Sequence, residues 1–220
     1  DLLMVDGSVA QATGLYEQVV AMLDPRDRER RSIRGSAMGM LAVRWRDAGD
    51  LEQARRWIER AQKEFRIDVQ DESCRDGLLS ANMTSATILA EAGDPQAAVQ
   101  LLRSELGRFA TAGPGLVRQA HLRAHFDRVL ANCLLMAGRR DEALPILDAG
   151  VERCRALLAR DESDRGAAYR LIEMLMLRER VHGEATGESD SDRVEAAAIA
   201  AQYGFASHAN PAPSAHRLPR

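Results

Sequence analysis

The sequence predicts an all-α protein built from antiparallel helix hairpins that repeat along the chain. Aromatic residues make up only 4% of the 220 residues, and Ala, Leu, Arg and Glu predominate, which favours helix over sheet. A glycine also returns every 42 to 45 residues, which is typical of a repeat architecture. In such an array each hairpin buries its apolar face against its neighbours, so we expect an α-solenoid.

The repeat is clearest in three segments that align without gaps around their turns: LAVRWRDAGDLEQARRWIERA, ATILAEAGDPQAAVQLLRSE and ANCLLMAGRRDEALPILDAG. Their turn glycines are Gly49, Gly93 and Gly138. Gly7 and Gly183 extend the series at its two ends. Glycine can take the left-handed backbone that ends a helix, and Asp50 and Asp94 follow where a side-chain oxygen can cap the next helix.

Each hairpin is predicted to pack through a small residue followed by a large one. Five positions after each of the first four glycines of this repeat series stands an alanine: Ala12, Ala54, Ala98 and Ala143. Four positions further comes a larger apolar residue: Tyr16, Ile58, Leu102 and Leu147. This spacing places both residues on one side of the helix, so two helices can approach closely at the alanine.

Apolar spacing and turn signals together predict nine helices. They are expected at 8–23, 28–48, 51–66, 72–92, 95–111, 115–137, 140–159, 163–182 and 191–203. The first would be the second helix of an incomplete hairpin, and the last two a degraded repeat joined by an acidic loop at 184–192. We expect one repeat domain over 1–204. The stretch 205–220 contains three prolines and is expected to be a disordered tail.

The small residue, the Gly-Asp pair and the alanine five positions after the glycine resemble the tetratricopeptide repeat, over about residues 1–183. The long period is similar to that of kinesin-light-chain-like proteins and of bacterial signalling regulators. The resemblance implies a right-handed superhelix (α-solenoid) that binds protein partners. The sequence departs from the family at Glu105, where a small residue is usual, and in lacking the proline that closes each repeat.

Composition and charge limit the classes of function that are possible for this chain. With 33 acidic and 30 basic residues the formal net charge is −3, which argues against bulk binding to nucleic acid. There is no apolar run long enough for a membrane span and no signal-peptide pattern at the first residues. Three widely spaced cysteines, Cys74, Cys133 and Cys154, favour a reducing cytoplasm. The missing initiator Met indicates a piece of a longer protein.

The sequence contains no motif of an enzyme or of a cofactor site. A glycine-rich phosphate loop, a nucleophile elbow, HExxH and CxxC are all missing. We therefore predict no catalytic residues, no metal and no cofactor, and interpret the cysteines as buried, inert thiols.

One stripe of polar side chains stands out on the helix expected at 115–137. His121, His125, Arg128 and Asn132 follow i, i+4, i+7 and i+11 spacing, and so lie on one side of that helix. Alignment to the repeat places the stripe on the concave face, and Arg170 occupies the same face in the next repeat.

Three interpretations of this stripe remain open. It could be a peptide groove in which Asn132 binds a ligand's main chain and Arg128 and Arg170 bind acidic groups. The histidine pair could bind zinc, although no third ligand is evident. The stripe could also be a solvated polar face. The Arg and Asn resemble part of the family's carboxylate clamp, but Met174 replaces the partner Asn.

We favour the groove, and with it a protein-interaction module that recognises a peptide or helix. The alternative is a small-molecule effector-sensing domain of a transcription regulator or Ser/Thr kinase. In either case the chain would be the C-terminal scaffold or sensor part of a larger bacterial signalling or regulatory protein, with the oligomeric state left open. Because unperturbed histidines titrate near neutrality, affinity for an acidic partner is expected to rise as the pH falls.

Overall fold

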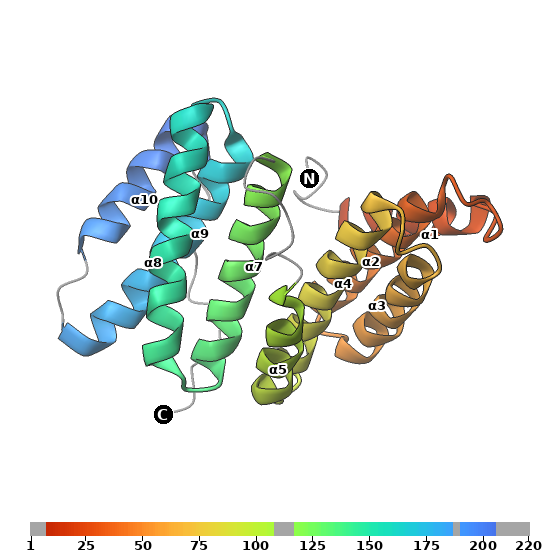
Figure 1. Cartoon of the computed structure of the whole chain (residues 1–220), viewed down its shortest axis with the longest axis horizontal. Helices are drawn as coiled ribbons and strands as arrows, with labels where there is room; N and C mark the ends of the chain where they lie inside the picture. The colour runs from red at the N-terminus through yellow and green to blue at the C-terminus, as the bar shows by residue number, and fades with distance from the viewer. Residues whose placement is uncertain (1–7, 108–116, 187–189, 206–220) are drawn as a thin grey trace. The chain divides into compact units, whose positions relative to one another are not determined.

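The computed structural model describes residues 8–107, 117–186 and 190–205, and every regular element in them is an α-helix. The helices are α1 (Ser8–Met22), α2 (Arg31–Asp47), α3 (Leu51–Arg66), α4 (Glu72–Glu91), α5 (Pro95–Glu105), α7 (Val117–Met136), α8 (Arg140–Arg160), α9 (Arg165–Thr186) and α10 (Asp190–Tyr203) (Figure 1). The all-α prediction is confirmed for this part of the chain.

The chain forms two compact units, Asp1–Leu102 and Arg103–Arg220. In the first unit α1 packs on α2, α2 on α3, and α3 on α4. In the second, α7 packs on α8, α8 on α9, and α9 on α10. Helices two apart also touch, α2 with α4 and α7 with α9. Each unit is therefore a stack of helix hairpins in sequence order, as predicted for an α-solenoid.

The predicted turn glycines end their helices with a left-handed backbone. The φ angles are 82° at Gly49, 97° at Gly93 and 72° at Gly138. At the first turn the amides of Gly49 and Asp50 donate to the carbonyls of Arg46 and Trp45, at 2.8 and 2.9 Å. These two hydrogen bonds form a Schellman motif, in which only the glycine position needs positive φ.

The residue after the glycine begins the next helix. The Asp50 carboxylate accepts from the amide of Gln53 at 2.9 Å, and the Asp94 carboxylate accepts from the amide of Ala97 at 3.0 Å. Each satisfies an amide that has no partner within its own helix. The Gly-Asp pair thus closes one helix and opens the next, as the sequence predicted.

Three predicted helix boundaries differ from the structure by three residues or more. The helix expected from residue 28 begins at Arg31, because the side chains of Asp24 and Asp27 bind amides of residues 26, 29 and 30 in turns. Gly183 does not end a helix, since α9 continues to Thr186. Instead Gly204, with φ of 71°, closes α10. The helix expected over 95–111 ends already at Glu105. Residue 111 itself, the next helix's expected start at 115 and Gly7 lie outside the described residues.

The predicted alanines lie in the interior. Ala54, Ala98 and Ala143 are fully buried, and Ala12 is nearly so. The larger residues one turn later, Ile58, Leu102 and Leu147, are also buried, and Tyr16 is partly buried against the core of the first unit. The spacing of small and large residues therefore predicted correctly which side of each helix faces its neighbour.

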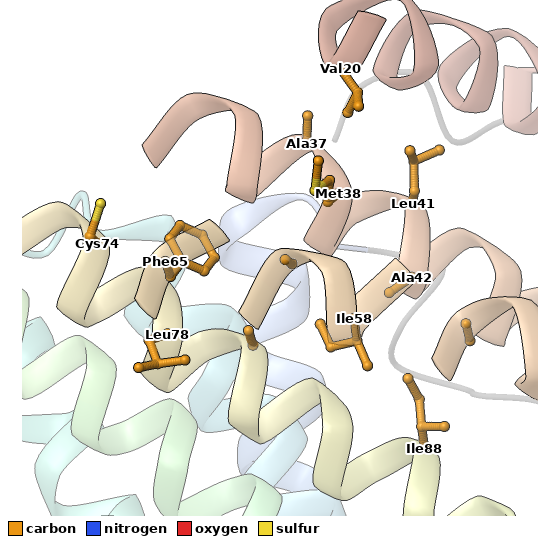
Figure 2. Packing of buried hydrophobic residues seen from close by; sticks show 13 residues of the cluster. Val20, Ala37, Met38, Leu41, Ala42, Ile58, Phe65, Cys74, Leu78 and Ile88 are labelled. Atoms are coloured by element: carbon orange, nitrogen blue, oxygen red, sulfur yellow. The ribbon is translucent and has the colours of Figure 1, made fainter. Parts of the chain in front are cut away.

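Phe65 of α3 lies in the core of the first unit (Figure 2). Its ring packs against two glycines of the neighbouring helices. A Cβ atom at Gly77 of α4 would lie 2.3 Å from the ring, and one at Gly35 of α2 would lie 2.6 Å from it. Carbon atoms that are not bonded do not approach so closely. Both α2 and α4 can therefore contact the Phe65 ring only because each has a glycine there.

Gly77→Ala should therefore overpack this core and lower the free energy of unfolding by about 1–3 kcal/mol. Urea unfolding of the variant checks this. Adding Phe65→Leu should reduce the loss caused by the alanine, because the two sites are coupled through the ring.

Gly39→Ala is the matched control, since no atom lies within 4 Å of a Cβ at this helical position. It should leave stability unchanged or raise it by about 0.5–1 kcal/mol. Equal effects of the alanine at Gly77 and Gly39 would contradict the proposed packing.

The second unit ends on an anchored aromatic residue. Phe205 follows Gly204 and makes an edge-to-face contact with Tyr169, with ring centroids 5.8 Å apart. The Arg165 guanidinium lies 4.8 Å from the centre of the same ring. Phe205 also packs against the core formed by α7, α8, α9 and α10. The predicted tail thus begins with a residue that packs on the fold, and residues 206–220 lie outside the described residues.

Phe205→Ala should lower the free energy of unfolding of the second unit by about 1–3 kcal/mol, because it removes aromatic packing and the cation–π contact. Val194→Ala, at a 64% exposed position on α10, serves as the control and should have little effect in the same thermal unfolding experiment. An unchanged midpoint for Phe205→Ala would show that the ring contributes nothing to the fold.

Candidate functional site

The predicted polar stripe lies where α7 meets α9. His121, His125, Arg128 and Asn132 belong to α7 and Arg170 to α9, and the two helices pack directly on each other. All five side chains are half-buried. We call this surface the α7/α9 face and include in it Glu173, which lies opposite Arg128.

One end of the α7/α9 face is a three-residue cluster. The His121 Nε2 lies 2.9 Å from a carboxylate oxygen of Asp164, whose other oxygen caps α9 by accepting from the amide of Ala167 at 2.9 Å. The His121 Nδ1 faces Nη1 of Arg170 at 3.4 Å, and the same Nη1 donates to the carbonyl of Gly166 at 3.0 Å. His121 therefore connects α7 to the first turn of α9.

Further along, an ion pair crosses the face. The Arg128 Nε lies 3.2 Å from a carboxylate oxygen of Glu173, and about a quarter of each side chain is exposed. The pKa of the neighbouring Tyr169 is raised, mainly by burial and also by Glu173, so its hydroxyl stays protonated. Arg128 is thus neutralised within the fold, which the sequence analysis did not anticipate.

Asn132 has hydrogen-bonding capacity to spare. Its amide nitrogen lies 3.8 Å from the Met136 sulfur, a weak acceptor, and this is its one hydrogen bond to the described residues. A carboxamide can donate two hydrogen bonds and accept two. This half-buried carboxamide therefore keeps donors and an acceptor that the described residues do not use.

His125 corrects one prediction. Burial, aided by the positive charges of Arg128 and Arg170, lowers the pKa of His125 to about 3. It was expected to titrate near neutrality and does not. The reason is that a protonated ring would lose its hydration and sit beside two guanidinium groups.

Met174, which stands where the family's clamp has its second Asn, is part of the core. It is fully buried, and its sulfur lies 2.6 Å from where a Cβ atom of Gly150 would be. Gly150 thus gives Met174 room to pack on α8. The α9 position that could complete a clamp is therefore used for packing.

One buried carboxylate of the second unit was not predicted from the sequence. Asp127 is 2% exposed and lies 2.8 Å from the Arg123 Nε and 3.2 Å from the Arg153 Nε. Burial raises its pKa, and the two arginines oppose that effect. The spacing of Arg123 and Asp127, four residues apart on one helix, is the signal that could have indicated the pair.

The part of the chain that the structure describes offers neither a cluster of metal ligands nor an accessible thiol. No three His, Cys, Asp or Glu side chains gather there as a metal site would require. Cys74, Cys133 and Cys154 are buried free thiols, and burial raises the pKa of Cys74 and Cys154 to about 11. None of the described helices is long and apolar enough to span a membrane.

The charge state of His125 has a measurable consequence. Its pKa of about 3 in the folded protein lies below the unfolded value of about 6.5, so the folded protein binds fewer protons between these values. The stability that this shift contributes is present above about pH 6.5 and is lost as the pH falls. Between pH 7 and 5, wild type should lose about 2 kcal/mol more stability than His125→Gln.

Urea unfolding of both proteins at the two pH values checks this. Other titrating groups cancel in the comparison, because both proteins carry them. A stability difference that stays constant with pH would contradict a neutral His125 in the folded protein.

Comparison with known proteins identifies the fold. The chain matches no protein-family model and no curated protein sequence. Among solved structures it is similar to a putative kinesin light chain of Podosopora anserina with nearly identical TPR-like repeats, at 21% identity and a TM-score of 0.52, over 90% of this chain and 89% of that one. A substituted variant of that protein matches at 21% identity and a TM-score of 0.53, over 91% and 90%. The chain therefore has a TPR-like repeat fold, and the predicted resemblance to kinesin-light-chain-like repeats is confirmed.

Proposed function

We propose that this chain is a protein-interaction module whose α7/α9 face binds an extended peptide. The TPR-like fold supports a protein partner, because an array of hairpins offers an extended surface built from side chains of successive repeats. The module would serve as the scaffold or sensor part of a larger bacterial signalling or regulatory protein in the cytoplasm. Its free thiols are compatible with that compartment.

The observation that carries the proposal is the unused hydrogen-bonding capacity of Asn132. Its carbonyl oxygen makes no hydrogen bond to a described residue, and its amide has only a thioether partner. A peptide main chain offers an N–H donor and a C=O acceptor, which a carboxamide can bind together. Burial of such a pair on binding would strengthen both hydrogen bonds.

The two arginines supply further donors. Arg170 uses Nη1 within the fold, and Arg128 pairs through Nε with Glu173. A guanidinium carries five N–H donors, so each keeps donors that could bind an acidic or carbonyl group of a ligand. Because Glu173 already neutralises Arg128, an acidic ligand group would share that arginine with it.

The geometry favours binding over catalysis. A general base needs a free ring nitrogen near the reacting group. Both ring nitrogens of His121 face partners in the fold, Asp164 and Arg170. His125 stays neutral far below physiological pH, because burial lowers its pKa. A polar face crossed by ion pairs also suits a peptide better than an apolar effector.

A peptide array tests the proposal. Wild type should bind a subset of extended peptides, and Arg128→Ala/Asn132→Ala should weaken that binding by about tenfold or more, as expected when central interface contacts are removed. Arg160→Ala/Gln202→Ala is the matched control, since both of these residues are exposed on α8 and α10. It should bind as wild type does.

Circular dichroism and thermal unfolding of both double variants separate lost binding from lost folding. If the folded Arg128→Ala/Asn132→Ala variant binds the same peptides with wild-type affinity, the α7/α9 face is not the binding surface.

A further inference from the structure

We propose that His121 is a positioning residue that holds Arg170 against the first turn of α9 while its ring is neutral, and releases it when the ring takes up a proton. This inference concerns the free protein and goes beyond the peptide-binding proposal. It rests on three contacts, which join His121 to Asp164, His121 to Arg170, and Arg170 to Gly166.

The partners of the ring determine which nitrogen carries the proton. Asp164 is a carboxylate that can only accept, so the Nε2 at 2.9 Å must donate to it. Arg170 is a guanidinium that can only donate, so the Nδ1 at 3.4 Å must present its lone pair. The neutral Nε2–H tautomer satisfies both partners at once, and the opposite tautomer satisfies neither.

Protonation of the ring affects the two contacts in opposite ways. The added proton on Nδ1 points at the Arg170 Nη1, which places two donors and two positive charges against each other. The contact of Nε2 with Asp164 survives and becomes charge-assisted. Only the contact with Arg170 is lost, and the remaining hydrogen bond from Arg170 to the carbonyl of Gly166 holds a group that is now repelled from His121.

Two titratable neighbours of the cluster, His125 and Cys154, keep their charge between about pH 5 and 8. On α7, the guanidinium of Arg118 stands three residues before His121. His125, one turn after it, stays neutral because its pKa is lowered to about 3. On α8, Cys154 lies near Arg170 and Asp164, and its raised pKa of about 11 keeps it a thiol. Histidine is the side chain whose charge changes between about pH 5 and 8.

The released arginine would change what the α7/α9 face offers. While His121 is neutral, Nη1 of Arg170 is directed at the ring and at Gly166. After protonation the guanidinium can turn toward the open side of the face, since Arg170 is half-buried rather than enclosed. The face then gains a positive charge on His121 and a more accessible one on Arg170.

Nuclear magnetic resonance of the ¹⁵N-labelled full chain from pH 8 to 5 tests this without a ligand. At pH 8 the His121 ring should carry its proton on Nε2. On acidification the side-chain signal of Arg170 should shift with the same midpoint as the ring of His121. The side-chain signal of Arg160, an exposed arginine on α8, should not follow that midpoint.

Two substitutions separate positioning from simple packing. His121→Gln keeps a donor for Asp164 and an acceptor for Arg170, so the Arg170 signal should stay at its pH 8 position throughout. His121→Phe removes both groups, so Arg170 should show the low-pH signal of wild type at every pH.

A proton on Nδ1 at pH 8 would overturn the proposal. So would an Arg170 signal that titrates in His121→Gln as it does in wild type. If His121→Phe does not fold, the comparison of wild type with His121→Gln still tests whether His121 positions Arg170.

Discussion

A turn in which one residue takes a left-handed backbone is the constraint on which the hairpins depend. At Gly49 the positive φ lets two amides reach the last carbonyls of α2, and Asp50 then caps α3. This short reversal brings α3 back along α2, and Ala54 near the start of α3 is fully buried. Once consecutive helices pair in this way, the first helices of adjacent hairpins must also meet, as α2 meets α4 and α7 meets α9.

The fold could be predicted from the sequence because its signals are local. A glycine, a capping carboxylate and an alanine act within about ten residues, so their spacing determines where a helix ends and which side is buried. The helix end predicted at residue 182 was wrong because it also rested on a local signal, Gly183. Inside a helix a glycine costs only about 1 kcal/mol relative to alanine, and α9 continues through it. Periodic glycine alone therefore does not establish a turn.

The candidate site could be predicted only in part. Helical spacing correctly placed His121, His125, Arg128 and Asn132 on one side of α7, since that depends on one helix alone. Which residues of α9 these side chains contact depends on how far α9 is displaced along α7. No local sequence pattern specifies that displacement. Hence the pairing of Arg128 with Glu173 and the neutrality of His125 emerged only from the structure.

This arginine-rich chain repeatedly encloses a carboxylate between two arginines. Glu64 lies 2.5 Å from Arg34 and 3.7 Å from Arg31 in the first unit, and Asp127 lies between Arg123 and Arg153 in the second.

Enclosed ion pairs add little net stability over apolar packing, but a displaced helix would leave their charges unpaired, so they favour one helix register. The ion pairs on the α7/α9 face likewise favour one register of α7 against α9. Because the fold itself neutralises much of that charge, the peptide proposed to bind there would be selected by matching donors and acceptors, at Asn132 above all, and less by net charge.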